Sequence, residues 1–444
     1  MNPPRHHADD SGSIPSLDHA PARLGPRARR AFERARDDAA EWAAAGFGAE
    51  RLLAAEAAVP LGVPLEKPRL RVAIGDPQAP LATFLEILDR NDLLAEDGRL
   101  HPHVMLASMG DHFDWGPAAH RAYAAENSIR LLSWLAAHAA SQVLLLAGNH
   151  DLSRVGELSG FDDATFAAAH DEAVELRAVP MHTPGRHERR RAFLDRHRAL
   201  PGVGVAARDW SGFEARQRIA IGSLLVAGRF RAAWAAAPDF LLVHGAVTPD
   251  DLRAFGLPDE AHADAVVIGE AFQEWFEDAI EAWSSPGTPP GAPLDLEPLY
   301  RIGDAERGES RGIFVQRPAD PDGGRDHPQL FEGPPRRRFD PRTLAPGLAQ
   351  VTGHIRDAKC RELMPRWSDP GRMVDGPLRH LWTDGAGVRY TPGVPGDGAR
   401  AAQAAGAAAL IYFTDGGMNH ADPARYELLD LDTRQPLCGG STLP

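Results

Sequence analysis

Cysteine and long apolar runs are both scarce in this chain. Its 444 residues include two cysteines, Cys360 and Cys438, so no disulfide framework is expected and a reducing compartment is indicated. No run approaches the ~20 apolar residues that cross a bilayer, and the first residues lack the apolar segment of a secretory signal. We therefore expect a cytoplasmic protein without a membrane partner, whose two cysteines are inert.

Positive charge is also in deficit. The chain has 48 Lys and Arg residues against 62 Asp and Glu, a formal net charge of −14. A surface of this sign repels nucleic acid and anionic membranes, so neither is an expected partner. Lys67 and Lys359 are the only lysines, so nearly all of the cations are arginines. A GC-rich coding sequence is the simple explanation, and a preference for paired hydrogen bonds to phosphate is the second.

The composition divides the chain into four parts. Residues 1–25 are rich in Pro, His, Asp and Ser without periodicity, which predicts a disordered tail. Residues 26–66 have helical spacing and predict a helical extension outside the catalytic sheet. Residues 67–435 form the expected main domain. Within it, 284–345 is a Pro-, Gly- and Asp-rich insertion, with an apolar island at 312–315 that suits a strand.

The main domain begins with alternating strands and helices. Short apolar runs predict strands at 70–74, 104–109 and 142–147, and amphipathic segments predict helices at 80–94 and 117–139. This order favours an α/β fold with a largely parallel, buried sheet.

The rest of the domain is less regular. Helices are expected to flank the site over 162–178, 187–199 and 212–236. The core is then expected to continue with a strand at 240–243, a helix at 261–283 and a strand at 348–352. Three β-like runs would close a second sheet, at 381–390, 408–414 and 426–431.

Five of the predicted strands end in a polar motif. These motifs are Gly75-Asp76, Gly110-Asp111, Gly148-Asn149-His150-Asp151, His244-Gly245 and Gly353-His354. In open α/β sheets, ligands bind at the carboxyl ends of the strands. We therefore expect these polar side chains to meet at one site.

The donor types in these motifs predict a dinuclear metal site. Asp111 is the natural bridge between two ions, and Asp76 and Gln78 are the expected ligands of the first. The expected ligands of the second ion are Asn149, His244 and His354. A mixed oxygen and imidazole set suits manganese, iron, zinc or cobalt. Two such ions supply a nucleophilic water and neutralise phosphoryl oxygens, as hydrolysis of a phosphate ester requires.

Hydrolysis also requires a proton for the leaving oxygen. His150 adjoins the expected ligand Asn149 and should face the same cleft without binding metal. Asp114, three residues after Asp111, is expected to keep His150 protonated and oriented. His150 and Asp114 are therefore the candidate general acid.

Taken in order, these motifs resemble those of a known superfamily. They are similar to the calcineurin-like metallophosphoesterases and, within them, to the phosphoprotein phosphatase (PPP) branch, which includes bacterial diadenosine tetraphosphatases and bacterial Ser/Thr/Tyr phosphatases. The most specific matches are GDHFDWG at 110–116, GNHD at 148–151, HGAVTP at 244–249 and SRGIF at 310–314. The resemblance covers roughly residues 70–435.

The resemblance implies a four-layer α/β/β/α sandwich with a dimetal site at the sheet edges. It implies that a hydroxide bridging two divalent ions (manganese, iron or zinc) attacks phosphorus, and that His150 with Asp114 protonates the leaving group. It also makes Arg311 a phosphate clamp. The implied substrate is a phosphoprotein, a nucleotide or a small phosphoester.

Three positions depart from the family pattern. Gln78 stands where the family's Asp-x-His motif has histidine, which weakens the first metal site or favours a harder ion. Trp115 replaces a phosphate-binding arginine of the PPP pattern, for which Arg154 and Arg356 are candidate substitutes; alternatively, Trp115 stacks on a base or an aromatic leaving group. Arg356 also stands where many non-PPP members have a second histidine, which agrees with the PPP branch.

These departures leave a second interpretation open. A catalytically degenerate protein of the same fold would bind a partner or a phospho-ligand through the N-terminal extension and the 284–345 insertion. Two bound ions would favour the enzyme, and one or none would favour the binding protein. A metal-dependent nuclease of the same superfamily is a third interpretation, which the acidic net charge disfavours.

Overall fold

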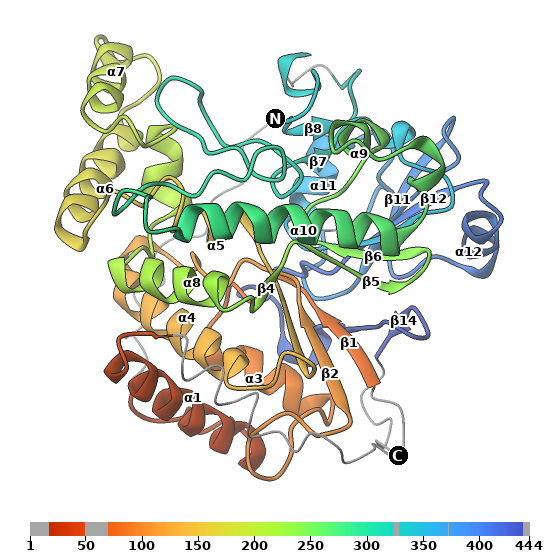
Figure 1. Ribbon diagram of the computed structural model, residues 1–444, viewed down its shortest axis with the longest axis horizontal. Coiled ribbons are helices and arrows are strands. Elements are labelled where there is room, and N and C mark those ends of the chain that lie inside the picture. The colour runs from red at the N-terminus through yellow and green to blue at the C-terminus, as the bar shows by residue number, and fades with distance from the viewer. Residues whose placement is uncertain (1–16, 49–69, 324–327, 372, 438–444) are drawn as a thin grey trace.

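The computed structural model describes residues 17–48, 70–323, 328–371 and 373–437 (Figure 1). Within them, two six-stranded sheets lie face to face and helices cover their outer faces. The predicted α/β class and four-layer α/β/β/α sandwich are therefore confirmed. The division into a tail, an extension and a main domain stays a prediction, and residues 1–16 and 49–69 lie outside the described part of the chain.

The first sheet is mainly parallel and comes largely from the first part of the chain. In spatial order its strands are β14 (Gln435–Pro436), β13 (Leu429–Asp430), β1 (Leu70–Ile74), β2 (Val104–Ser108), β3 (Val143–Leu146) and β4 (Phe230–Arg231). Strands β1 to β4 run parallel, and β13 pairs with β1 antiparallel. The helices α3 (Leu81–Arg90) and α4 (Arg121–Ala136) connect the first three parallel strands, as predicted.

The second sheet is mixed. In spatial order its strands are β11 (Val388–Pro392), β10 (Arg379–Thr383), β12 (Ala409–Phe413), β9 (Ala349–Thr352), β6 (Phe240–Val243) and β5 (Ala233–Ala237). Its centre, β12-β9-β6, is parallel, whereas both edges pair antiparallel. Three parallel strands therefore end at one edge of this sheet, as β1 to β3 do in the first.

The apolar core lies in layers that follow the alternation of the strands. Leu144 and Leu146 of β3 meet Leu242 and Val351 of the second sheet in the cluster between the sheets. Alternate residues of the same strands, such as Leu145, face the helical layer instead. Because successive side chains of a strand point to opposite faces, short runs that are apolar throughout must be covered on both sides.

Helices of different length cover the sheets. They are α1 (Pro26–Ala44), α5 (Asn149–Leu152), α6 (Asp163–Ala178), α7 (Arg186–Arg196), α8 (Ala215–Val226), α9 (Pro249–Ala254), α10 (Ala265–Ser284), α11 (Asp357–Leu363) and α12 (Asp397–Ala404). The long helix α10 crosses the second sheet beside β5 and β6 (Figure 1). No helix of the described residues is both long and apolar enough to cross a membrane.

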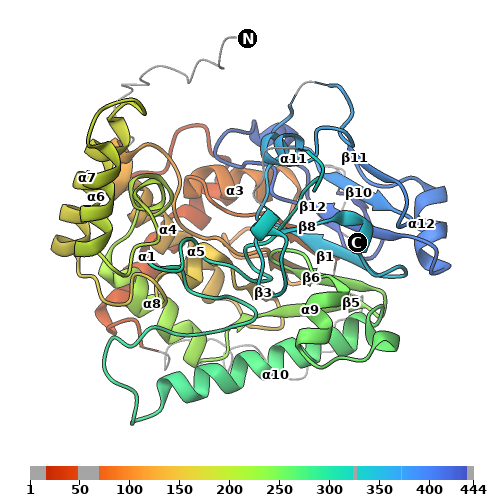
Figure 2. The same ribbon diagram turned by 90° about the horizontal axis from the view of Figure 1, so that it is seen from above.

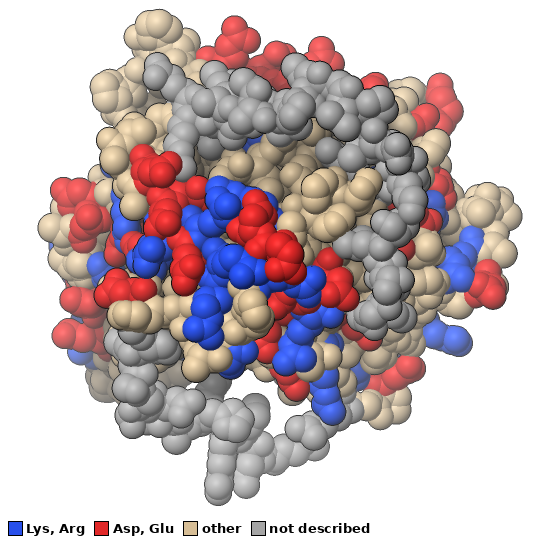
Figure 3. All heavy atoms as spheres, turned by 90° about the horizontal axis from the view of Figure 1, so that it is seen from below, with Lys and Arg blue, Asp and Glu red and all other residues tan. Residues whose placement is uncertain are grey.

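Helix α1 packs against the outer side of α3 and α4. Its apolar side is buried through residues such as Phe32 and Trp42. At its edge, Arg27 forms an ion pair with Asp89 at 2.7 Å. The view from below shows cationic and anionic side chains interspersed on this side of the molecule (Figure 3). The described part of the predicted extension is thus joined to the helical layer of the first sheet.

A separate group of helices stands at one side of the molecule (Figure 2). Helices α6 and α7 and the single π-helical turn η2 (Val205–Asp209) share a small apolar core that includes Phe166, Phe193 and Phe213. Helices α6 and α7 correspond to the first two predicted flanking helices. Arg208 and Asp209 of η2 line the cavity that is described below.

The structure corrects three sequence predictions. The helix predicted over 212–236 ends at Val226, because Gly228 (φ +65°) turns the chain into β4 and β5. The Ala-rich β5 has high helix propensity, but pairing with β6 decides its conformation. The island at 312–315 forms turns, and the short strand β7 (Arg317–Pro318), paired with β8 (Arg338–Phe339), follows it. The run at 426–431 joins the first sheet as β13, not the second.

Candidate metal centre

The carboxyl ends of strands from both sheets meet at one place. Asp111 follows β2, His244 follows β6 and His354 follows β9, and each has a candidate ligand atom within 4.8 Å of the others. All three side chains are buried. The sequence predicted these residues as metal ligands, and the structure brings the three together.

The two histidine rings are fixed by backbone carbonyl groups. Nδ1 of His244 donates to the carbonyl oxygen of Met109 at 2.7 Å, and Nε2 of His354 donates to that of Val315 at 2.8 Å. The other nitrogen of each neutral ring therefore carries a lone pair. Metal-binding histidines are commonly oriented by a hydrogen bond of this kind.

Several lone pairs converge on the same small volume. Nε2 of His244 lies 3.4 Å from Oδ2 of Asp111 and 3.2 Å from Oδ1 of Asn149. With Nδ1 donating to Met109, the Nε2 lone pair of a neutral His244 would face two other acceptors. Burial disfavours a proton on this ring, but the charge and hydrogen bond of Asp111 raise the pKa of His244. A cation bound between the lone pairs removes their repulsion, so the donor set fits a divalent metal ion.

The charges around the centre support the same interpretation. Asp111 is buried, but His244 and His150 hold its pKa below the ordinary value. Burial, together with the nearby guanidinium of Arg317, holds the pKa of His354 well below the ordinary value. Asp111 is thus a carboxylate and His354 a neutral imidazole, which are the forms that bind metal.

Close backbone packing holds Asp111 in place. A Cβ atom on Gly148 would collide with the backbone nitrogen and the carboxylate of Asp111, and one on Gly110 would lie 2.7 Å from the nitrogen of Gly148. Glycine is therefore required at both positions. The φ angles of Asp111 and His354 are +57° and +63°, a region that costs non-glycine residues of order 1–3 kcal/mol each.

Asp151 ties the two motif loops together. Its carboxylate accepts hydrogen bonds from the backbone nitrogens of Asp111, His112 and Gly148, each at 3.0 Å, and it contacts Nδ1 of His112 at 3.0 Å. Sequence reasoning gave Asp151 no role. Its position as the last residue of the GNHD motif is the sequence feature that could have indicated this role.

The predicted acid pair is formed. Nδ1 of His150 lies 2.8 Å from Oδ2 of Asp114, and Nε2 lies 4.0 Å from Oδ2 of Asp111. Burial opposes protonation of His150, but the charge of Asp111 and the hydrogen bond and charge of Asp114 raise its pKa to about 9. This arrangement favours the protonated form of His150, with Nε2 directed to Asp111.

Arg154 holds the His150–Asp114 pair in position. It is fully buried, and it donates to Oδ1 of Asp114 at 2.7 Å, to the carbonyl oxygen of His150 at 3.0 Å and to Gln217 at 3.2 Å. Arg154 is a positioning residue for Asp114, and this placement gives no support to its predicted contact with phosphate.

Asp76 and Gln78, the predicted ligands of the first metal, lie beside the histidine cluster. Both carboxylate oxygens of Asp76 accept from the backbone nitrogen of His354, at 3.1 and 2.9 Å. Nε2 of Gln78 donates to the carbonyl oxygen of Phe113 at 2.8 Å, which fixes the amide plane. Asp415, which follows β12, shares the same buried space, and sequence reasoning gave it no role.

A cavity of about 420 Å³ opens onto this space. Its lining residues are Asp76, Gln78, Asp114, Trp115, Gly116, Pro117, His150, Arg208, Asp209, Arg356, Asp415, Gly417, Met418, Asn419 and His420. Arg356 and Arg208 are the arginines in this lining. Trp115 lines it too, although the ring is buried and its Nε1 donates to Ser128 at 3.2 Å.

Arg311, the clamp implied by the family motif, is not among the residues that line the cavity. Its charged neighbours are Arg301, Arg337 and Glu332, and its Nη1 donates weakly to the carbonyl oxygen of Gln329 at 3.4 Å. The structure therefore does not bring Arg311 to the other candidate residues.

Arg317 is a cation that sequence reasoning missed. It belongs to β7, its charge acts on Asp111 and His354, and its buried Nε has no hydrogen-bond partner among the described residues. No motif marks it, because β7 is a two-residue strand within the Pro- and Gly-rich insertion.

Cys360 takes no part in the centre. It is buried, and burial raises the pKa of its thiol to about 12. Cys438 lies outside the described residues.

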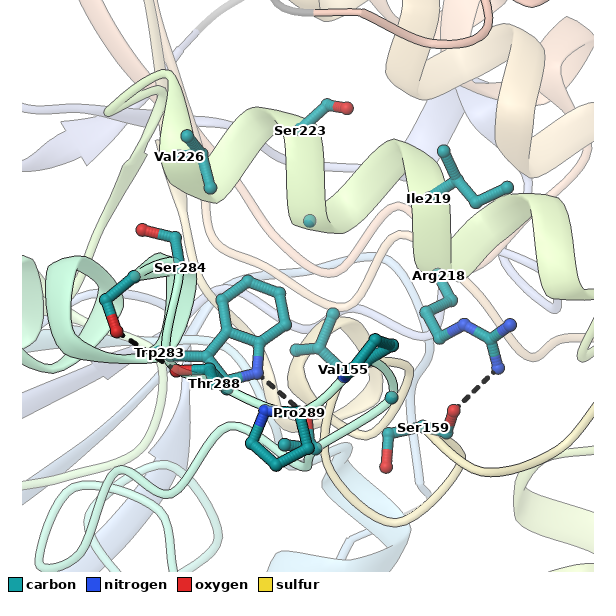
Figure 4. Close-up of a pocket in the computed structure, with 15 residues that line it drawn as sticks. Val155, Ser159, Arg218, Ile219, Ser223, Val226, Trp283, Ser284, Thr288 and Pro289 are labelled. Atoms are coloured by element: carbon teal, nitrogen blue, oxygen red, sulfur yellow. Dashed lines mark hydrogen bonds between the residues drawn. The ribbon is translucent and has the colours of Figure 1, made fainter.

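A second cavity, of about 490 Å³, lies between α8 and the chain after α10 (Figure 4). It shares no lining residue with the first. Arg218 donates to the carbonyl oxygen of Ser159 at 2.8 Å, and the indole of Trp283 donates to that of Ala292 at 2.8 Å. These prominent donors are therefore already satisfied.

Comparisons with known proteins give a matching family model and similar solved structures. A family model described as calcineurin-like phosphoesterase matches residues 71–318, more than half of the chain. Among solved structures, the chain is similar to a cold-active protein-tyrosine phosphatase of a psychrophilic Shewanella species, with 12% identity, 82% of this chain and 75% of that chain covered, and a TM-score of 0.34. Another structure of a cold-active protein tyrosine phosphatase gives 15% identity, 50% and 55% coverage, and a TM-score of 0.26. No curated protein matches the chain.

Proposed function

The chain belongs to the calcineurin-like phosphoesterase family, and from this premise we propose that it is a PPP-type phosphatase with a dinuclear metal centre. Membership makes it a phosphoester hydrolase. The PPP branch, the number of ions and the substrate class are parts of the proposal.

The observation that carries the proposal is the convergence of Asp111, His244 and His354, with both rings oriented by backbone carbonyl groups. Two divalent cations at such a centre lower the pKa of water and neutralise charge on phosphoryl oxygens. Asp111 would lie between the two ions, and His244, His354 and Asn149 would hold the second.

The acid step follows from the geometry of His150. Asp114 accepts the Nδ1 proton at 2.8 Å and thereby fixes the ring, so Nε2 is the atom that donates a proton to the leaving oxygen. The ion pair between Arg154 and Asp114 keeps the carboxylate charged. Arg154 thus supports the acid step from outside the reacting atoms.

The arginines that line the cavity are the proposed substrate-binding groups. Arg356 and Arg208 would bind the phosphoryl oxygens, because they line the same cavity as His150. A phosphorylated side chain, a nucleotide or a small phosphoester is the proposed class of substrate. The formal charge of −14 disfavours a nucleic-acid substrate.

A catalytically degenerate binding protein is the second candidate. The observation in its favour is Gln78, an amide held by the carbonyl oxygen of Phe113 where the family has a histidine ligand. This candidate retains at most one metal ion and binds a phosphorylated ligand without turnover.

The test is hydrolysis of p-nitrophenyl phosphate by metal-stripped protein titrated with Mn²⁺, with Asn149→Ala as the matched variant. Activity that returns with Mn²⁺ in the wild type and not in the variant supports the phosphatase. Inactivity with Mn²⁺, Zn²⁺, Co²⁺ and Mg²⁺, on this substrate and on a phosphopeptide, would favour the binding protein.

A further inference from the structure

Asp415 occupies the end of a strand that lies next to the strand of a predicted metal ligand. Strand β12 pairs parallel with β9, with Phe413 opposite Thr352. Two residues further on, this register sets Asp415 level with His354. The backbone nitrogen of Thr414 continues the pairing by donating to the carbonyl oxygen of Thr352 at 2.9 Å.

The same residue also meets the first sheet. A Cβ atom on Gly75 would collide with the carbonyl group of Thr414 and would lie 2.8 Å from the nitrogen of Asp415. Gly75 directly precedes Asp76, so the chain that carries Asp76 lies against the chain that carries Asp415. Both carboxylates line the cavity, together with Gln78.

The two carboxylates are buried, and the neighbouring Arg379 donates to the backbone carbonyl oxygen of Asp415, not to its carboxylate. Asp76 is 2% exposed and Asp415 is 6% exposed. The one hydrogen bond that the Asp415 carboxylate accepts among the described residues comes from the nitrogen of Gly417, at 3.0 Å. No Lys or Arg of the described residues forms an ion pair with either carboxylate, and buried charges without a partner are costly.

Like charges at close range in a buried site repel one another. Carboxylate oxygens are the donors that hard divalent cations prefer, so Asp76, Asp415 and the adjoining Asp111 suit such an ion.

We propose that Asp415 is a ligand of the first metal ion, together with Asp76 and Asp111. Asp415 supplies from the second sheet the donor that is missing where Gln78 replaces histidine. The inference rests on the proposed metal centre and names a ligand that the family motifs do not contain.

The donor chemistry makes the two metal sites unlike. The first has carboxylates and the amide oxygen of Gln78, which has no hydrogen-bond partner among the described residues. The second has two imidazoles and an amide. Oxygen donors favour hard ions such as Mn²⁺ or Mg²⁺, whereas imidazoles suit zinc and iron. The first site should therefore prefer Mn²⁺ over Zn²⁺ more strongly than the second.

The experiment is a Mn²⁺ titration of the metal-free full chain by isothermal calorimetry, with bound metal measured by mass spectrometry. Wild type is expected to bind two ions per chain. Asp415→Asn, which removes the charge and keeps the shape, is expected to weaken one site at least about tenfold and leave the other unchanged. The EPR spectrum should change accordingly, from a spin-coupled pair to an isolated Mn²⁺ ion.

Two further variants control for loss of structure. Asp375→Asn removes an exposed carboxylate close to Gly417 and should leave both sites intact. Adding Gln78→His to Asp415→Asn restores an imidazole donor and should return the second ion. Such a rescue cannot come from an unfolded variant.

The outcomes separate this inference from the proposed function. If wild type binds two ions and Asp415→Asn also binds two with unchanged affinity, Asp415 is not a ligand and the inference is overturned. If wild type itself binds one ion or none, the proposed dinuclear centre fails and the inference fails with it.

Discussion

The histidine half of the centre and the carboxylate half are fixed in different ways. His244 and His354 are oriented by backbone carbonyl groups, which leaves one lone pair of each ring for a metal ion. Asp76 and Asp415 are held together against their mutual repulsion by the packing of two chains at Gly75. The histidine half is thus preorganised by hydrogen bonds, whereas the carboxylate half would depend on the proposed first metal ion.

Asp111 belongs to both halves, so its removal should have the largest effect. Asp111→Asn is expected to abolish the binding of both ions and to lower phosphatase activity by about 10³-fold or more, because several kcal/mol of transition-state stabilisation is lost. Metal content and p-nitrophenyl phosphate hydrolysis measure the two effects. A variant that keeps two ions and its rate would remove the bridging role.

The acid pair lies outside both halves, and its loss should separate chemistry from metal binding. His150→Ala is expected to keep both ions and to lower kcat by about 10²–10⁴-fold, the usual contribution of a general acid. Calorimetry and steady-state kinetics check the two parts. An unchanged kcat would show that another group donates the proton.

The pH profile sharpens the role of Asp114. A rate that requires protonated His150 falls as the pH rises through its pKa, which the charge of Asp111 and the hydrogen bond and charge of Asp114 raise to about 9 against burial. Asp114→Asn removes that charge, so the pKa of His150 falls and the alkaline limb of kcat should move to lower pH. An alkaline limb that stays in place in the variant would contradict the pairing of the two residues.

The arginines should give the smallest effects, mainly on KM. Arg356→Ala removes a cation from the cavity and should raise KM about tenfold, since a hydrogen bond to a charged group contributes about 1.5–3 kcal/mol. Arg311→Ala is the matched control and should leave KM unchanged, because Arg311 does not line the cavity. A raised KM in Arg311→Ala and an unchanged KM in Arg356→Ala would instead support Arg311 as the phosphate clamp that the family motif implies.

Local sequence patterns predicted the parts of the structure that depend on local contacts. The apolar runs at 70–74 and 240–243 coincide with β1 and β6, because strands covered on both faces must be apolar throughout. Residues at the ends of such strands, including Asp111 and His244, could be assigned to one site because parallel strands end at one edge.

The remaining features depend on contacts between distant segments. The Ala-rich segment at 233–237 has a helical composition, and its pairing with β6 makes it a strand. The register of β12 with β9 brings Asp415 to the centre, and no sequence motif marks this residue. Arg311 matched a motif, yet its side chain lies among Arg301, Arg337 and Glu332. Sequence spacing does not determine such long-range registers or side-chain directions.

The most direct test of a metal centre with a histidine half and a carboxylate half is a crystal structure of the protein soaked in Mn²⁺, with anomalous scattering data. Two anomalous peaks ~3.5–4 Å apart are expected, with Asp111 between them. One peak should be bound by His244 and His354, and the other by Asp76 and Asp415. A single peak at the histidines, or a second peak from which the Asp415 carboxylate points away, would contradict it.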